Sequence, residues 1–521
     1  MKKLTLLALV LTLVVAWAAT ASAVELKVRG AIIADSMWGD GGNAQFWDAK
    51  NGGPYQDKHN IEERARLCFD FIASENLKFT TQFQIGTGMW GQNSFALGQG
   101  DARTNGSAAV RTREAYFDFN IPNSDVNVKA GYMLMYLPAA YEGGSPILND
   151  EAAGVALVTI PVIKDTLAVL VGYTRLWDSS SSNNTSNAVT GRNNGYGMKD
   201  ELDAAILALP ITYNKVEVTP WMVYGWGGKD ALNDTVLGSA NTQTEAIGLL
   251  APRADRALTG VNGRSFQNNF NVWWAGLAAT VKMFDPIVFG ADYNYGSLTG
   301  MKAVDGATAP FDSNKLAERK GWYADAFVKY TALEMVKPQL FFAYSSGEDS
   351  DPTNGSERMP ILYNGGYALG ISWWTGGSNF SQTDMGGDNR HIGFWALGLS
   401  LNDITLMEKL SHDFMFMYAK GTNSASLLRD PNVIAQAGLG TTQIAPGHFL
   451  TTKDQFFEID LNTKYKIYDE LTAILELGYI NMNTNKDLWN DYLYGLTPAA
   501  GTRLYKSADA YKVATGLKYA F

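Results

Sequence analysis

Residues 511–521 read Tyr511-Lys512-Val513-Ala514-Thr515-Gly516-Leu517-Lys518-Tyr519-Ala520-Phe521. Every second residue of this stretch, counted from Tyr511 to Phe521, is aromatic, aliphatic or β-branched, and the residues between them are small or cationic. This period of two is that of a β-strand with one apolar and one polar face. The stretch therefore predicts a strand at the end of the chain, in a barrel wall or in a soluble β-sandwich.

The beginning of the chain has the pattern of an export signal. A basic start at residues 1–3, an apolar run over residues 4–19 and a small-residue motif at residues 21–23 follow one another. We expect a signal peptide over residues 1–23 and a single mature domain over residues 24–521. No later apolar run approaches the ~20 residues that a membrane helix needs. A chain of this kind that spans a membrane must do so as a closed barrel, because only helices and barrels satisfy every backbone group in lipid.

Composition and charge narrow the class further. The chain has 52 Gly, 25 Tyr, 24 Phe and 14 Trp but only 16 Pro and one Cys, a balance typical of strands and turns. Its net charge is −10, which becomes −12 when the two lysines of the signal peptide are removed. An acidic chain is a poor match for nucleic acid. Cys68 has no second cysteine with which to form an internal disulfide.

Alternating strands continue through the chain. Residues 77–86 are a clear two-faced strand, and ~9–11 residues suffice to cross a bilayer at a tilt. Counting eight short turns and nine long polar loops predicts an all-β fold, a transmembrane antiparallel barrel of 18 strands. Short periplasmic turns and long extracellular loops are typical of such barrels. Sixteen strands is the alternative, because strands near Ile206, Val223 and Leu397 are apolar on both faces and residues 365–374 could themselves form a strand.

From Leu26 to Phe521 the chain resembles the general porins of Gram-negative outer membranes, most closely the homotrimeric porins of sulfate-reducing bacteria. Three motifs carry the resemblance: RTREAYFDFN from Arg111, VNVKAGY from Val126, and the terminal YAF. The resemblance implies a water-filled barrel in the outer membrane, three to an assembly, that passes small hydrophilic solutes and ions by passive diffusion.

The same resemblance implies partners and an assembly signal. The partners are two further copies of the chain, the lipid and lipopolysaccharide of the outer membrane, and the barrel-assembly machinery. That machinery reads the C-terminal strand, here through Leu517, Tyr519 and Phe521.

In general porins the third loop folds into the lumen and carries carboxylates that face basic residues on the wall. Here the third loop is residues 136–150, and its Tyr141-Glu142-Gly143-Gly144 segment is a loose match to the acidic motif of that loop. We expect Glu142 at the constriction, with Asp150 and Glu151 at the end of the loop. The family's Pro and Phe around the acid are absent, so the sequence does not fix whether the loop folds inward.

Five basic residues fall where the opposing wall is expected: Arg64, Arg66, Arg111, Arg113 and Lys129. We predict that they point inward, because Arg or Lys facing lipid at mid-bilayer costs ~2–4 kcal/mol. Phe117 and Phe119 share the phase of Arg111 and Arg113, so for these two arginines the prediction requires that the phenylalanines leave the lipid face or lie beyond a bulge.

One acid-rich stretch suggests a metal. Residues 348–355 read EDSDPTNG, and clustered oxygen donors suit Ca²⁺. Asp349 and Asp351 are therefore candidate calcium ligands in an extracellular loop, although the spacing is not that of an EF-hand. No other cofactor is predicted.

An enzymatic function is not predicted. The four histidines, His59, His391, His412 and His448, lie in no recognisable catalytic motif. Two alternatives to a general diffusion channel stay open: a substrate-selective channel, for example for sugars, and a non-conducting structural or adhesive surface barrel.

Overall fold

The computed structural model describes residues 24–39, 58–92, 96, 110–178, 201–229, 231, 268–300, 318–351, 354–362, 368–380, 393–430, 444, 446–494 and 505–521. The predicted signal peptide, residues 1–23, lies outside this range.

The described chain is almost entirely strand, with two short helical elements near its end. The first ten strands are β1 (Glu25–Gly39), β2 (Lys58–Ser74), β3 (Leu77–Met89), β4 (Val110–Asn120), β5 (Asn127–Met135), β6 (Glu151–Ile163), β7 (Leu167–Asp178), β8 (Glu201–Ala208), β9 (Ile211–Tyr213) and β10 (Val216–Gly227). The remainder are β11 (Phe270–Phe284), β12 (Ile287–Thr299), β13 (Arg319–Tyr330), β14 (Lys337–Ser345), β15 (Phe394–Met407), β16 (Leu410–Gly421), β17 (Gln455–Lys466), β18 (Leu471–Asn483) and β19 (Ala510–Ala520), with η5 (Ala425–Arg429) and α6 (Lys486–Tyr494).

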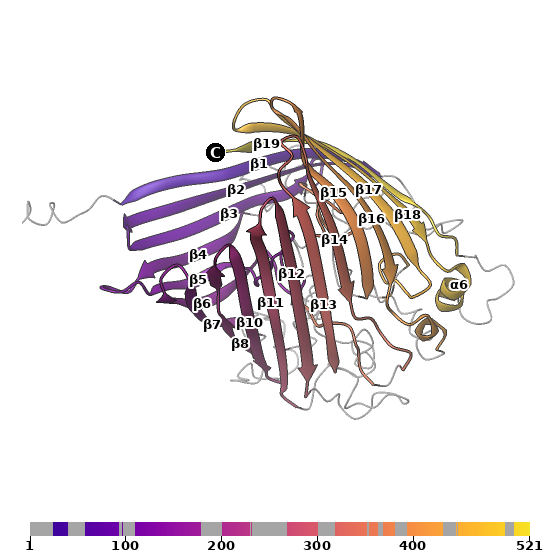
Figure 1. Ribbon diagram of the computed structural model, residues 1–521, viewed down its shortest axis with the longest axis horizontal. Helices are drawn as coiled ribbons and strands as arrows, with labels where there is room; N and C mark the ends of the chain where they lie inside the picture. Colours follow the sequence, from indigo (N-terminus) through magenta and orange to yellow (C-terminus); the bar gives the residue numbers. More distant parts are fainter. Residues whose placement is uncertain are drawn as a thin grey trace, which may run out of the picture.

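The strands form one closed antiparallel ring. Each strand pairs with its neighbour in sequence, and β19 pairs with β1 to close the sheet; the two strands lie side by side in Figure 1. The sheet has 19 strand segments, but β8 and β9 both lie between β7 and β10 and are separated only by Leu209 and Pro210. They count as one interrupted strand, so the predicted barrel of 18 strands is confirmed.

The apolar face of each strand points outward. In β19, Tyr511, Leu517 and Tyr519 are exposed, whereas Lys512 and Ala514 between them are buried in the barrel interior. An apolar outer band facing lipid and a polar lumen is the arrangement of transmembrane barrels. Within the described residues, no helix is long and apolar enough to span a membrane.

The seam of the barrel ends on the last residue. The amide of Phe521 donates to the carbonyl oxygen of Gly30 (3.1 Å), and the amide of Gly30 donates to the carbonyl oxygen of Phe521 (2.9 Å). Gly30 leaves room for this contact, because a Cβ there would lie 2.5 Å from the Arg66 carbonyl oxygen and 3.3 Å from the Phe521 ring. The predicted assembly residues Leu517 and Tyr519 lie on the outer face of the same strand.

We expect deletion of Phe521 to reduce the folded barrel recovered from outer membranes severalfold. The deletion removes two seam hydrogen bonds, each worth about 0.5–1.5 kcal/mol, and the aromatic ring beside Gly30. The measurement is the fraction of protein that migrates as the compact, unheated form in gel electrophoresis. Phe521→Tyr keeps the backbone and the ring and should assemble normally; equal recovery of the deletion variant would contradict the role of Phe521.

Candidate channel constriction

Loop 136–150 folds into the barrel and reaches the far wall. The amides of Ala140 and Tyr141 donate to the carboxylate of Asp292 on β12, at 2.7–2.9 Å. The Tyr141 ring is 3% exposed and packs edge-on against Phe327 of β13 and Phe341 of β14, with ring centroids 5.7 and 6.1 Å apart. The sequence did not fix this inward fold; the structure shows it.

A second segment, described over residues 354–362 and 368–380, also lies inside the barrel. Its Leu362 amide donates to the Ile147 carbonyl oxygen (2.9 Å), and its Ala368 amide donates to that of Gly143 (3.2 Å). Gly143 permits this contact, because a Cβ there would lie 1.7 Å from the Ala368 oxygen.

Buried carboxylates of the wall hold the second segment. Glu458 of β17 accepts hydrogen bonds from the Ser372 hydroxyl and the Trp374 amide, both at 2.8 Å. Glu476 of β18 accepts from Ser378 and Asn379 and pairs with Lys512 at 2.9 Å. Both carboxylates are fully buried, so this side of the lumen is filled with packed loop rather than water.

The two loops also account for strands that are apolar on both faces. Ile206 and Val223 lie on inner faces, and they belong to one hydrophobic cluster with Tyr141 and Trp374. Leu397 instead lies on the outer face, at 46% exposure.

The arginines predicted for the opposite wall line the inner faces of β2 and β4. Arg66 lies beside Gln84, its Nε donating to the amide oxygen at 2.9 Å. Arg64 lies across from Gly86 on the same inner face, and an Arg111 nitrogen donates to the Gly86 carbonyl oxygen at 3.4 Å.

A bulge brings Arg113 to the same face. The β3–β4 register shifts between Gln82 and Phe83, so that Glu114 pairs with Gln82 and Thr112 pairs with Phe83. Arg113 is the extra residue, and its side chain donates to Gln82 at 3.1 Å. Phe117 stays on the outer face, 56% exposed. The phase conflict in this strand is therefore resolved by one inserted residue.

Asp150 is the loop carboxylate that meets these arginines. One of its oxygens lies 3.2 Å from Arg113 and 4.0 Å from Arg66, and the other accepts a hydrogen bond from the Tyr136 hydroxyl at 2.8 Å. Burial, and then the hydrogen bond to Asp150, raise the pKa of Tyr136 above its usual range. The hydroxyl therefore remains protonated and keeps donating to Asp150.

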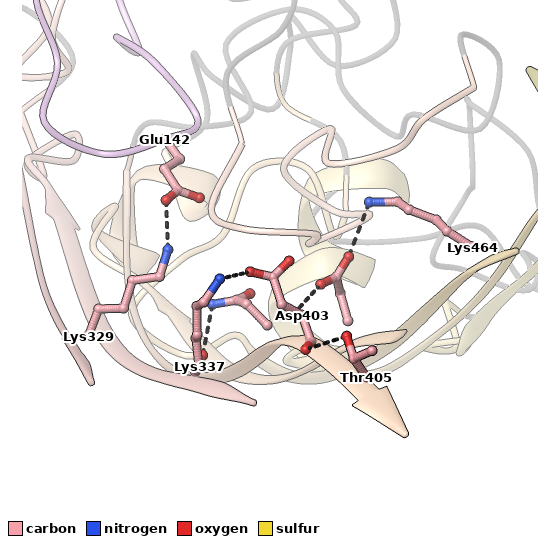
Figure 2. Close-up of polar contacts among 8 residues, drawn as sticks. Glu142, Lys329, Lys337, Asp403, Thr405 and Lys464 are labelled. Atoms are coloured by element: carbon pink, nitrogen blue, oxygen red, sulfur yellow. Dashed lines mark hydrogen bonds and ion pairs between the residues drawn. The ribbon is translucent and has the colours of Figure 1, made fainter. Parts of the chain in front are cut away.

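Glu142 instead meets a lysine far from the arginines. Its carboxylate lies 2.8 Å from Nζ of Lys329 on β13, and its side chain is 76% exposed. Figure 2 shows Glu142 pointing from its loop toward Lys329, with Lys337 beside Asp403 and Lys464 nearby. Lys337 pairs with Asp403 at 2.7 Å, and Lys464 pairs with Asp413 at 3.2 Å.

Sequence reasoning missed this second charged zone at the periplasmic end of β13–β17. Lys329, Lys337 and Lys464 occupy inward positions of their strands, and this alternation could have predicted that they face the lumen. The contact between Lys329 and Glu142 joins residues that are 187 positions apart, and no local pattern encodes it.

The other two predicted pore residues, Lys129 and Glu151, lie near the ends of their strands. Lys129 of β5 faces inward and lies 3.7 Å from Asp118, which Lys78 also approaches at 3.3 Å. Glu151 is the first residue of β6 and pairs with Met135 in the ladder.

The candidate calcium residues lie in an extracellular loop. The Asp349 carboxylate accepts from the Asp351 amide (2.6 Å) and from the Asn354 side chain (2.8 Å). In the part of the chain that the structure describes, no three His, Cys, Asp or Glu side chains gather as metal ligands. The adjoining residues 352–353 and His391 lie outside that part, and the calcium site stays a prediction.

The fixed charges and the packed loops divide the lumen. Inner residues of β2–β5 are mostly partly exposed, Arg66 at 30% and Lys129 at 42% among them, whereas most inner residues of β11–β18 are buried under the loops. The charged β2–β5 wall is therefore the described surface that a water path would follow. Charges on such a wall set ion partition, because a low-dielectric surround focuses their field.

Comparison with known proteins adds little beyond the fold. No protein-family model matches the sequence, and no curated protein matches it. Among solved structures, OccAB4 of Acinetobacter baumannii has a TM-score of 0.47 at 9% identity, covering 96% of this chain and 99% of that chain. OpdQ of Pseudomonas aeruginosa has 0.45 at 10%, covering 95% and 98%. The outer membrane channel DcaP of A. baumannii has 0.40 at 12%, covering 95% and 97%.

At these scores the likeness says nothing about function, and the fold rests on the strand pairing of the chain itself. A closed antiparallel ring with an apolar outer face and a charged inner face defines a transmembrane β-barrel. The chain is an 18-stranded barrel of the Gram-negative outer membrane, with short periplasmic turns and long extracellular loops.

Proposed function

We propose that the chain is an outer-membrane porin, a water-filled channel through which small hydrophilic solutes and ions diffuse passively. The observation that carries the proposal is the water-exposed charge on the inner wall of β2–β5, facing an inward loop that brings Asp150 to Arg113 and Arg66. In a channel, charge on the lumen wall selects among ions.

Several finer features belong to the same proposal. The signal peptide of residues 1–23 is removed on export, three chains assemble, and outer-membrane lipid, lipopolysaccharide and the barrel-assembly machinery are the partners. The protein acts as a conduit and not as an enzyme. The trimer and the partners follow from the resemblance to general porins, whereas the signal peptide is inferred from the pattern of residues 1–23. The broad apolar outer face is compatible with both lipid and a neighbouring barrel.

The test is single-channel conductance of the unheated, detergent-extracted protein in a planar bilayer, with a salt gradient to give the reversal potential. We expect large ohmic openings that close in three equal steps. Openings that close in single steps would contradict the trimer but not the channel. Silence from protein shown to be folded would contradict the channel and favour a non-conducting surface barrel.

A second candidate is a substrate-selective channel. The observation in its favour is the extent of inward packing: loop 136–150 reaches the far wall, and it meets the second segment through Gly143 and Ala368. Such packing narrows the lumen. A selective channel would show current block that saturates with one class of solute, whereas a general porin would show block by none.

A further inference from the structure

An apolar pocket lies inside the barrel at the foot of the inward loop. It encloses about 190 Å³. Its lining includes Leu137 and Pro138 from the loop and Leu157, Leu170, Ile206 and Trp221 from the inner faces of β6, β7, β8 and β10.

These wall residues occupy inward positions, where barrels of this class carry polar side chains. The register places Leu170 across from Ala208, which also lines the pocket, and Leu157 across from Gly172. Gly172 makes room for the leucine, because a Cβ there would lie 2.4 Å from a Leu157 methyl. Leu157 and Leu170 remain only half-buried. Covering apolar surface that faces a water path with an apolar group is favourable, because both surfaces leave water.

The size of the pocket indicates what can cover it. A protein cavity of about 150 Å³ lined by Leu, Ile and Phe stays dry and binds benzene. The present pocket is somewhat larger and similarly lined. The buried Trp221 indole N–H, which has no acceptor among the described residues, adds one hydrogen-bond donor to the wall.

The pocket borders the charged site. Tyr136 lines it, and the Tyr136 hydroxyl bonds to Asp150, which contacts Arg113. A solute whose apolar group sits in the pocket would thus keep its polar end beside the water path and the fixed charges.

We propose that this pocket binds the aromatic ring of a small solute in transit, and so makes the channel retain aryl-bearing solutes over polar ones of similar size. The inference rests on the proposed channel function and names the substrate class that the site prefers. Retention is brief, because the burial of a single ring is a weak driving force.

The test compares two neutral amides, benzamide and malonamide, on single channels of the full-length protein. Benzamide should cause brief reversible interruptions of the current whose frequency rises with its concentration, and malonamide should not. Ala208→Phe fills the pocket and should reduce the interruptions by about tenfold or more. Ala156→Phe is the matched control, because Ala156 faces outward on β6, next to Leu157, and should leave them unchanged.

The outcomes separate this inference from the channel itself. Normal conductance with no benzamide effect, or an equal effect in Ala208→Phe, would overturn the pocket and leave the channel intact. If the wild-type protein does not conduct, saturation-transfer NMR of benzamide on the detergent-solubilised protein tests binding in the pocket independently of conduction. We expect a signal with the wild-type protein and its loss in Ala208→Phe. If Ala208→Phe does not reach the compact form in unheated gels, Leu170→Phe takes its place.

Discussion

Replacing Asp292 by Ala should increase single-channel conductance by roughly twofold and add rapid current noise, because pore width sets ion flow. The Asp292 carboxylate accepts the hydrogen bonds of the Ala140 and Tyr141 amides, at 2.7–2.9 Å. Hydrogen bonds to a charged acceptor contribute about 1.5–3 kcal/mol each, and their loss also leaves two amides without partners. The inward position of loop 136–150 then depends on the packing of Tyr141, on the Glu142–Lys329 ion pair and on the hydrogen bonds to the second segment.

Asp325 provides the matched control. It pairs directly with Asp292 across β12 and β13 and is equally buried, but neither of its oxygens accepts a hydrogen bond from the loop. Asp325→Ala should therefore leave conductance near the wild-type value. An equal increase in both variants would indicate general loosening of the barrel, and no increase in Asp292→Ala would show that the carboxylate does not hold the loop.

Replacing Arg66 and Arg113 together by Glu should shift the permeability ratio toward cations by roughly tenfold, because focused fixed charges raise local counter-ion concentration by that order. Both side chains face Asp150, at 4.0 and 3.2 Å, so the variant places three carboxylates where one carboxylate and two guanidinium groups now meet. Lumen positions tolerate such changes in barrels. The measurement is the reversal potential under a salt gradient.

Two comparisons make this result specific. Arg66→Gln with Arg113→Gln should give a shift of the same sign and about half the size on the scale of free energy, because the change in charge is halved. Lys164→Glu with Lys409→Glu makes the same change in net charge in short turns between strands, and the reversal potential should hardly move. An unchanged reversal potential in the Arg66 and Arg113 variant would remove the arginine cluster from the ion path.

Much of the barrel could be predicted from the sequence, because the period of two is local. The alternation in residues 511–521 predicts which side chains face outward, and Tyr511 and Leu517 do so. The phase conflict between Arg113 and Phe117 left two possibilities, an inward phenylalanine or a bulge, and the β3–β4 register contains the bulge.

The filling of the lumen could not be predicted in this way. Alternation assigns Lys512 to a water-facing side, yet it is 2% exposed, paired with Glu476 and lying over the Trp373 ring at 5.6 Å. The two-residue period shows which face of the strand a residue occupies, but it does not show what covers that face. The covering segment comes from a loop more than a hundred residues away. The contact of Glu142 with Lys329 rather than with the arginines is also long-range, and the local pattern could not predict it.

The ring of strand pairings also bears on how the barrel forms. Every pairing joins strands that are neighbours in sequence, except the one between β1 and β19. Local hairpins close small loops at little entropic cost, whereas the seam brings together Gly30 and Phe521, nearly the whole chain apart. Folding can therefore proceed hairpin by hairpin, with one late closure of high contact order that limits the rate. Until that closure, β1 and β19 are two open edges, and a stalled intermediate would expose both to other chains.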